Sequence, residues 1–305
     1  IESWRESVTV DEAQKIRGIG LGLKILVDQV QGIKVIATGS SSFELAGQVG
    51  EPLVGRKLTL TLFPIAHCEL KKTAFELNEE LEKYLIYGKY PAVMVARHAD
   101  EKKRILEDLV ESYLLKDILE LDRVKNAKIL VDLLRLIAFQ IGNEVSLSEL
   151  GKQLGMDYKT VARYLDLFEK TFILYNLRGF SGSNQRKHIA KKSKYYFWDN
   201  GIRNAIIANF NSLALRDDVG KLWENFLVSE RLKVQEYKKI YANNYFWRAA
   251  SQKEIDWIEE REGKLHGYEF KWGKKLPKMP TQWREENPGA TFEVVYQKNY
   301  LEFIA

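Results

Sequence analysis

The sequence predicts an α/β protein with several domains, and three observations lead to this fold class. The chain has 305 residues, which is too long for one small core. Short β-branched strands alternate with amphipathic helices near both ends of the chain. Between them, from about residue 75, apolar residues recur at helical spacing and the outer faces are charged. We therefore expect an α/β region at each end and a helical region between them.

The composition is that of a globular protein, with 45% hydrophobic and 29% charged residues. No apolar run approaches the roughly 18 residues of a transmembrane helix, so we expect no membrane partner. The first residues, IESWRESVTV, lack a starting Met and do not form a signal peptide. A single cysteine excludes an internal disulfide and fits the reducing cytoplasm, where we expect this protein. The net charge of +5 is too small to indicate nucleic-acid binding by itself.

The N-terminal region reads as strand, helix and two further strands. Residues 8–11 form the first predicted strand, and residues 33–42 and 58–64 form the next two. The acidic pair Asp11 and Glu12 ends the first strand. Carboxylates in this position are typical of a nucleotide-hydrolysing site, where they act on the metal ion and the attacking water. From these residues alone, the alternative is a capped helix start.

The middle of the chain combines helices with a more specific pattern. Residues 75–88, 100–121 and 127–142 each predict a helix. Over residues 146–177, two short helices flank a tight turn, Gly-Met-Asp, that supplies a helix cap. Two strands, FILYNLRGF and KYYFWD, then enclose a loop rich in glycine, serine and lysine. This order predicts a winged helix-turn-helix.

The predicted wing is strongly basic. If it lies on a nucleic-acid backbone, five of its side chains would face the phosphates: Arg186, Lys187, Lys191, Lys192 and Lys194. On the second helix, Lys159 and Arg163 would reach a groove or a phosphate. The alternative is a protein–protein module, which winged helices also form.

A third pattern lies in the C-terminal hairpin, KEIDWIEE followed by KLHGYEFKW. The period of the strands can place Asp256, Glu269 and Lys271 on one surface, and Glu224 can join them from the helix of residues 221–234. Two or three carboxylates can bind Mg²⁺ through oxygen, and a lysine beside them can stabilise a phosphoryl transition state. The alternative is a solvated strand face with a cross-strand ion pair.

Taken in order, these segments resemble a bacterial and archaeal family of AAA+-type ATPases that carry a C-terminal DUF4143 domain. The matching stretches are VTVDEAQKI, IKVIATGSSSFEL, LVGRKLTLTLFP, YGKYP, YYFWDNG, LWENFLVSE, EIDWI and YEFKW. The resemblance implies a partial P-loop-type parallel sheet over residues 1–70 and a helical lid or linker over 71–142. It implies a winged helix over 143–200 and a restriction-endonuclease-like α/β domain over 201–305.

The resemblance also implies ATP and Mg²⁺ as cofactors. Asp11 would help to hold Mg²⁺, Glu12 would polarise the attacking water, and Thr38 or Ser40 would sense the γ-phosphate. Arg56 would stabilise the transferred charge, in an arrangement that can include self-association. No G-x-x-x-x-G-K-[ST] loop occurs in the sequence, so we expect this chain to bind ATP weakly or not at all.

Two functional hypotheses follow. In the first, the intact protein is an ATPase that acts on DNA or on a protein partner. In the second, residues 146–305 form a DNA-binding or Mg²⁺-dependent nuclease-like module that works without nucleotide, with Asp256 and Glu269 holding the metal. A scaffold with neither activity is the third alternative.

Overall fold

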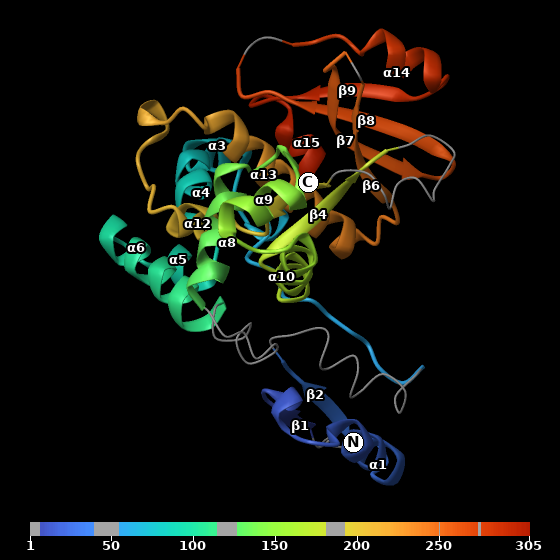
Figure 1. Ribbon diagram of the computed structural model, residues 1–305. Helices are drawn as coiled ribbons and strands as arrows, with labels where there is room; N and C mark the ends of the chain where they lie inside the picture. The colour runs from blue at the N-terminus through green and yellow to red at the C-terminus, as the bar shows by residue number, and fades with distance from the viewer. Residues whose placement is uncertain (1–6, 40–54, 115–126, 181–192, 250, 274–275) are drawn as a thin grey trace.

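The computed structural model describes residues 7–39, 55–114, 127–180, 193–249, 251–273 and 276–305 (Figure 1). Within these ranges, every helix is too short or too polar to cross a lipid bilayer. The described elements form a small N-terminal unit, a group of helices, and a C-terminal part built around one large mixed sheet.

The N-terminal unit holds two parallel strands and the helix that connects them. β1 (Ser7–Val10) pairs with β2 (Lys34–Ala37), and α1 (Ile19–Gln29) makes the crossover that a parallel pair requires. The helix begins at Ile19, because Gly18 adopts a left-handed φ of 74° and turns the chain into the helix. Figure 1 shows this unit apart from the layers that hold the later elements.

The third predicted strand, residues 58–64, does not form in this structure. Among the described residues, this extended segment pairs with no other strand. Leu58, Leu60 and Leu62 expose 82%, 71% and 94% of their surface. An alternating pattern indicates a strand only when a neighbouring strand receives its backbone hydrogen bonds, and no described strand lies there.

The helical region follows. Its elements are α3 (Ala74–Glu79), α4 (Leu81–Tyr87), α5 (Pro91–Val95), α6 (Ala99–Asp108), the π-helical turn η3 (Leu109–Leu114) and α8 (Ala127–Phe139). Leu130, Leu133 and Ile137 of α8 are fully buried. Their spacing of three and four residues gives α8 one apolar face, which packs against Leu85 and Leu106 in the main core.

Two capped helices and a hairpin come next. The elements are β3 (Glu144–Val145), α9 (Leu147–Leu154), α10 (Tyr158–Lys170), β4 (Leu174–Gly179) and β5 (Ser193–Phe197). The Ser146 hydroxyl caps α9, and the Asp157 carboxylate accepts hydrogen bonds from the first backbone N–H groups of α10. β4 and β5 are antiparallel, and β3 adds to the other side of β5. The order of elements matches the order on which the winged-helix prediction rests.

The C-terminal part begins with helices. Its elements are α12 (Asn200–Ile206), the 3₁₀ turn η4 (Leu213–Leu215), α13 (Val219–Lys238), β6 (Asn243–Arg248), β7 (Glu254–Arg261), β8 (Lys264–Phe270), α14 (Thr281–Glu286), β9 (Thr291–Val295) and α15 (Tyr300–Ile304). The Asp199 carboxylate caps α12 by accepting hydrogen bonds from the backbone N–H groups of Gly201 and Ile202. β6, β7 and β8 are antiparallel neighbours, and β9 joins β8 in parallel.

One seven-stranded sheet joins the hairpin to the C-terminal strands, in the order β3-β5-β4-β6-β7-β8-β9. The connection is the parallel pairing of β4 with β6, in which Arg178 lies beside Tyr245. α13 and α15 cover one face, where Phe226 and Phe303 pack with Tyr268 of β8 in the main core. On the other face, Trp283 of α14 packs against an aromatic group that includes Phe180 and Trp247. This continuous sheet fixes the hairpin relative to the last strands.

Candidate functional site

The first candidate site lies at the carboxyl ends of β1 and β2. Asp11 directly follows β1 and Thr38 directly follows β2, and the two strands are parallel neighbours. The Thr38 hydroxyl donates a hydrogen bond to the Asp11 carboxylate. The backbone continues the pairing, because Thr38 N–H donates to Val10 C=O at 2.9 Å and Ala13 N–H donates to Thr38 C=O at 2.8 Å. The structure therefore brings together two predicted site residues that are 27 positions apart.

Glu12 lies beside them in an unusual backbone conformation. Its φ of 50° and ψ of 44° are left-handed, which is uncommon for a residue with a Cβ atom. The Glu12 carboxylate lies 3.3 Å from Lys15 Nζ and is partly exposed. Carboxylate and hydroxyl oxygens at one strand edge are the ligand types that Mg²⁺ prefers. Asp11 and Thr38 therefore fit a nucleotide-bound magnesium ion in donor chemistry.

Arg56 and Ser40, two other predicted residues, are not part of this contact. Ser40 lies outside the described residues. Arg56 forms an ion pair with Asp28 of α1, and both side chains are at least one-third exposed. The structure therefore places Arg56 against the helix of the N-terminal unit.

The second candidate site is a cluster of buried carboxylates under α13. Glu224 comes from α13, Asp256 from β7 and Glu269 from β8, and each exposes less than 9% of its surface. Phe270 N–H donates to Asp256 Oδ2 at 2.8 Å, and Lys271 Nζ lies 2.7 Å from Glu269 Oε1. The predicted hairpin is formed, but Asp256 and Glu269 face the interior instead of a solvated surface, whereas Lys271 is partly exposed.

An irregularity in β7 helps to place Asp256. Tyr245 pairs with Ile258 and Trp247 pairs with Ile255, so an advance of two residues on β6 corresponds to an advance of three residues on β7. One extra residue in β7 makes a bulge at residues 256–257, and a bulge changes the face to which side chains point. This lets Ile255 and Ile258 pack on the α14 face while Asp256 lies under α13 with Glu224.

Lys194 corrects one prediction. We expected it on the surface of a basic wing, but its side chain is 1% exposed. Its Nζ lies 3.5 Å from Glu224 Oε1, 3.7 Å from Glu254 Oε2 and 4.0 Å from Asp256 Oδ1. The expectation was wrong because a run of basic residues in the sequence does not show which of their side chains will point from a strand into the core. β5 directs Lys194 at the carboxylates, which compensate its charge.

Glu224 is enclosed on its other sides as well. The Tyr196 hydroxyl donates to Glu224 Oε1 at 2.7 Å, and Lys221 Nζ lies 3.5 Å from Oε2. At Gly142, an added Cβ would lie 2.9 Å from both oxygens of Glu224. The backbone of Gly142 therefore closes the cluster at close range, and a residue with a Cβ atom there would require the Glu224 carboxylate to move.

The charges in this cluster set its protonation. Burial, together with Glu224 and Glu269, raises the pKa of Asp256 well above its ordinary value. Burial also acts to raise the pKa of Glu224, but Lys194 and Lys221 outweigh it and hold that pKa below its ordinary value. For Lys194, burial acts to lower the pKa, and the carboxylates outweigh it and raise the pKa. The favoured state is an ionised Glu224 beside a charged Lys194.

This arrangement does not fit a divalent metal ion. Within the parts of the chain that the structure describes, no three acidic, histidine or cysteine side chains are arranged to hold a metal ion. Mg²⁺ needs oxygen ligands at about 2.0–2.1 Å, but Glu224 and Asp256 both face the Lys194 ammonium. Glu269 Oε2 is buried and has no hydrogen-bond partner among the described residues.

The structure describes only some of the residues that the sequence predicted to contact nucleic acid. Lys159 and Arg163 are exposed on α10, and the Arg163 guanidinium lies 5.3 Å from the centre of the Tyr164 ring. Four predicted residues of the wing lie outside the described residues: Arg186, Lys187, Lys191 and Lys192.

Sequence reasoning missed a third polar centre, which is fully buried. Lys89 Nζ lies 2.7 Å from Glu230 Oε2, and Lys233 Nζ lies 2.8 Å from Glu230 Oε1. The backbone N–H of His67 donates to Glu230, and His67 Nδ1 lies 3.4 Å from Lys89 Nζ. Asp199 accepts a hydrogen bond from Lys89 N–H at 2.7 Å. The available signal was the opposite charges of Glu230 and Lys233, which lie three residues apart and therefore on one face of α13.

The pKa values in this centre are strongly shifted. Burial and the charge of Lys89 lower the pKa of His67 to about 3. Burial lowers the pKa of Lys89 to about 8, although Glu230 acts in the opposite direction. Burial acts to raise the pKa of Glu230, but Lys233 and Lys89 outweigh it and lower that pKa to about 2. The folded state therefore holds a neutral His67 and an ionised Glu230.

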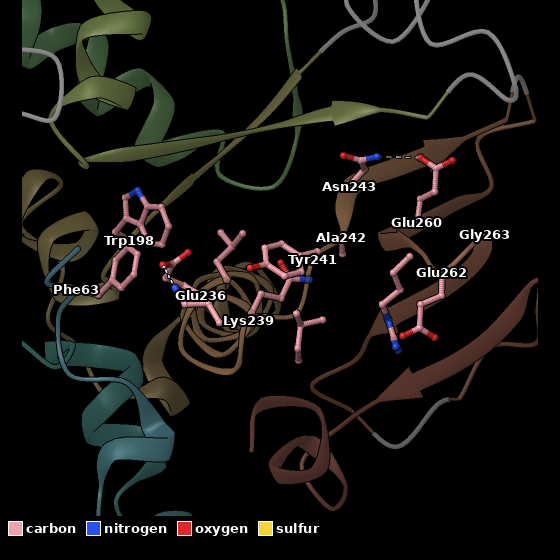
Figure 2. Close-up of a pocket in the computed structure, with 14 residues that line it drawn as sticks. Phe63, Trp198, Glu236, Lys239, Tyr241, Ala242, Asn243, Glu260, Glu262 and Gly263 are labelled. Atoms are coloured by element: carbon pink, nitrogen blue, oxygen red, sulfur yellow. Dashed lines mark hydrogen bonds and ion pairs between the residues drawn. The ribbon is translucent and has the colours of Figure 1, made fainter. Parts of the chain in front are cut away.

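A separate groove of about 740 Å³ lies at the end of α13 (Figure 2). Phe63 and Trp198 stack at one side of it with ring centres 4.7 Å apart, and Tyr241 projects into it from the chain before β6. The site residues predicted from the sequence are not among those that line it. The groove is therefore distinct from both carboxylate sites.

Comparison with known proteins divides the chain into three matched regions. An AAA domain matches residues 1–71, and a C-terminal domain of unknown function, DUF4143, matches residues 219–296. Between them, a second domain of unknown function, DUF8612, matches residues 78–213. His67 falls in the first of these regions, Lys89 in the second and Glu230 in the third, so the buried centre joins all three.

Curated relatives match along most of the chain. Uncharacterized proteins of Mycobacterium tuberculosis and Mycobacterium bovis are each 25% identical over 269 residues, which cover 87% of this chain and 58% of theirs. An uncharacterized protein of Haemophilus influenzae is 27% identical over 186 residues, covering 57% of this chain and 46% of its own. The chain thus spans less than two-thirds of the length of these relatives. The matches of an AAA domain to residues 1–71 and of DUF4143 to residues 219–296 together support an AAA-type ATPase with a C-terminal DUF4143 domain.

Proposed function

We propose that this chain forms the part of an ATP-hydrolysing protein that holds magnesium and activates water. The observation that carries the proposal is the hydrogen bond from Thr38 to Asp11, across the carboxyl ends of two adjacent parallel strands. In open α/β sheets, ligands bind at the carboxyl ends of the strands. The match of the AAA domain to residues 1–71 supports the same conclusion.

The chemistry of each predicted site residue suits one step of ATP hydrolysis. Asp11 would hold Mg²⁺ through a carboxylate oxygen, while Glu12 would accept a proton from the attacking water. The Thr38 hydroxyl would sense the γ-phosphate, and Ser40 is the alternative for this part. Arg56 would stabilise the transferred charge, as a neighbouring subunit's arginine can do in a self-associated form. When bound, ATP with Mg²⁺ supplies the phosphoryl group and the charge that neutralises it.

We propose that the helices and the hairpin of residues 143–200 bind the target on which the protein acts. The order β3, α9, α10, β4, β5 is that of a winged helix, and α10 presents Lys159 and Arg163 to solvent. Side chains of this kind contact phosphates or base edges when a recognition helix enters the major groove. DNA is therefore the first proposed target, and a protein partner is the alternative.

The C-terminal region is proposed to have a restriction-endonuclease-like fold. The succession α13, β6, β7, β8, α14, β9, with a parallel last strand, supports this proposal, as does the position of Asp256, Glu269 and Lys271. Metal-dependent cleavage of DNA at these residues is the alternative function, although the contacts of Lys194 with Glu224 and Asp256 argue against a metal ion there. It predicts cleavage that is lost in Glu269→Ala and in Lys271→Ala, whereas cleavage that survives both changes would place the chemistry elsewhere.

Glu12→Gln in the complete gene product tests the ATPase proposal. Loss of a general base typically lowers the rate by about 10²- to 10⁴-fold, so phosphate release should fall into this range while a labelled ATP analogue still binds. Glu79→Gln is the matched control, because Glu79 is an exposed glutamate of α3. Hydrolysis at the unmodified rate in Glu12→Gln would contradict the proposal.

A further inference from the structure

We propose that Lys194 is the internal cation of the C-terminal carboxylate cluster and takes the place of a metal ion there. In this assignment, the nuclease-like core is a closed structural centre that does not bind a divalent cation. The inference concerns a different part of the chain from the ATPase site and does not depend on ATP hydrolysis.

The distances place Lys194 among carboxylates from two different elements. Its Nζ lies 3.5 Å from Glu224 Oε1 on α13, and 3.7 Å and 4.0 Å from Glu254 and Asp256 on β7. A divalent cation shared by Glu224 and Asp256 would have to lie about 2.1 Å from their oxygens. That position is within a few ångströms of the ammonium, where two positive charges would repel each other strongly in a buried environment.

The space around the cluster is also occupied. Lys194 is 1% exposed, and its Nζ lies 5.1 Å from the centre of the Phe246 ring. Gly142 approaches the Glu224 carboxylate from the opposite chain segment so closely that a Cβ would collide with it. A metal ion with the water ligands that Mg²⁺ usually keeps would have to displace these groups.

The sheet holds Lys194 in place. β5 lies between β3 and β4, and Lys194 has Glu144 as its partner on one side and Leu177 on the other. A residue paired on both sides cannot be withdrawn by a loop movement, because its strand would have to leave the sheet. Lys194 is therefore a fixed component of the cluster and cannot leave it to make room for a metal ion.

The same contact connects two parts of the chain. Lys194 comes from the hairpin strand β5, within the region that DUF8612 matches, while its carboxylate partners lie within the DUF4143 match. The charges that would otherwise hold a metal are used to attach the hairpin to α13 and β7. This gives the acidic residues a function without catalysis.

Counting bound Mn²⁺ by electron paramagnetic resonance on the complete gene product tests the assignment. The unmodified protein should bind the same number of ions as its Asp256→Asn and Glu269→Gln variants. If either variant loses an ion that the unmodified protein binds, the assignment is overturned. This comparison does not require a change at Lys194.

The Lys194→Ala variant provides the second part of the metal-binding test. Removal of the ammonium should create a Mn²⁺ site that Asp256→Asn abolishes, and added Mn²⁺ should raise Tm by several degrees, because an ion bound only by the folded state stabilises it. Lys253→Ala is the control, since Lys253 is an exposed lysine just before β7, and it should gain no ion. A folded Lys194→Ala protein without an additional ion would overturn the assignment.

Discussion

Lys89 Nζ lies 2.7 Å from Glu230 Oε2, and both side chains are almost completely buried. The backbone N–H of His67 donates to the same carboxylate, so one ion pair connects segments from three regions of the chain. Buried pairs of this kind add little net stability compared with apolar residues, but removal of one partner is costly because the other charge stays buried. The pair should therefore hold the three regions together.

Lys89→Met tests this conclusion. We expect the free energy of unfolding to fall by about 3 kcal/mol, the lower end of the range for a broken buried pair, because Lys233 still compensates Glu230. Urea unfolding followed by tryptophan fluorescence measures the change. The control is Lys239→Met, which breaks a Lys–Glu pair of the same 2.7 Å length on the surface. Equal effects of the two changes would refute the special contribution of burial.

The stability should depend on pH through His67. Its pKa is lowered from 6.5 to about 3 by burial and by Lys89, so the folded state leaves it neutral where the unfolded chain binds a proton. Its contribution is complete above pH 6.5 and is lost as the pH falls towards 3, by about 1.4 kcal/mol per pH unit at most. The carboxylate of Glu230, whose pKa is lowered to about 2, adds a loss in the same direction below pH 4.5.

Urea unfolding at pH 7 and pH 5 separates the histidine from the carboxylates. His67→Phe keeps an aromatic ring against Tyr84 and Phe226, and it should weaken the loss of stability between these two pH values. His98→Gln, a change at an exposed histidine, should keep the full loss. If the His67→Phe protein loses as much stability as the unmodified protein, His67 is not the group that titrates.

Gly142→Ala should destabilise the protein through the carboxylate cluster. Gly142 has a φ of 69°, and its new Cβ would lie 2.9 Å from the Glu224 oxygens. Gly263→Ala is the matched control, since Gly263 has a φ of 71° and open space around it. The control should cost about 1 kcal/mol for the left-handed backbone alone, and Gly142→Ala should cost more. Thermal unfolding of both variants gives the comparison, and equal costs would show that Glu224 can move aside.

Combined substitution of Lys159 and Arg163 by Ala tests contact with DNA. Each lost phosphate contact should reduce the slope of log K against log salt by about 1, so the double variant should lose about 2. Fluorescence anisotropy with a labelled duplex at several salt concentrations measures this slope. A double variant of Lys264 and Lys298, both exposed elsewhere in the C-terminal part, should behave as the unmodified protein does. An unchanged slope in the Lys159/Arg163 variant would exclude α10 as the contact.

Local patterns in the sequence predicted much of the fold. The capped helices α9 and α10, the apolar face of α8 and the hairpin of β7 and β8 follow from spacing within a few residues. The juxtaposition of Asp11 and Thr38 was also predictable, because parallel strands end at the same edge. The predicted strand at residues 58–64 did not form, because its alternating pattern could not show whether another strand would lie beside it.

The sequence by itself determined the α/β class, the acidic pair after the first strand and the carboxylates of the C-terminal hairpin. Only the tertiary structure decided that Lys194 faces Glu224, that Lys89 meets Glu230, and that β4 pairs with β6. The reason is physical: a lysine has the same charge in a loop and in a core, and its free energy depends on which carboxylates surround it. Those carboxylates come from other elements, so the fold converts a basic residue expected to contact DNA into the internal cation of a buried cluster.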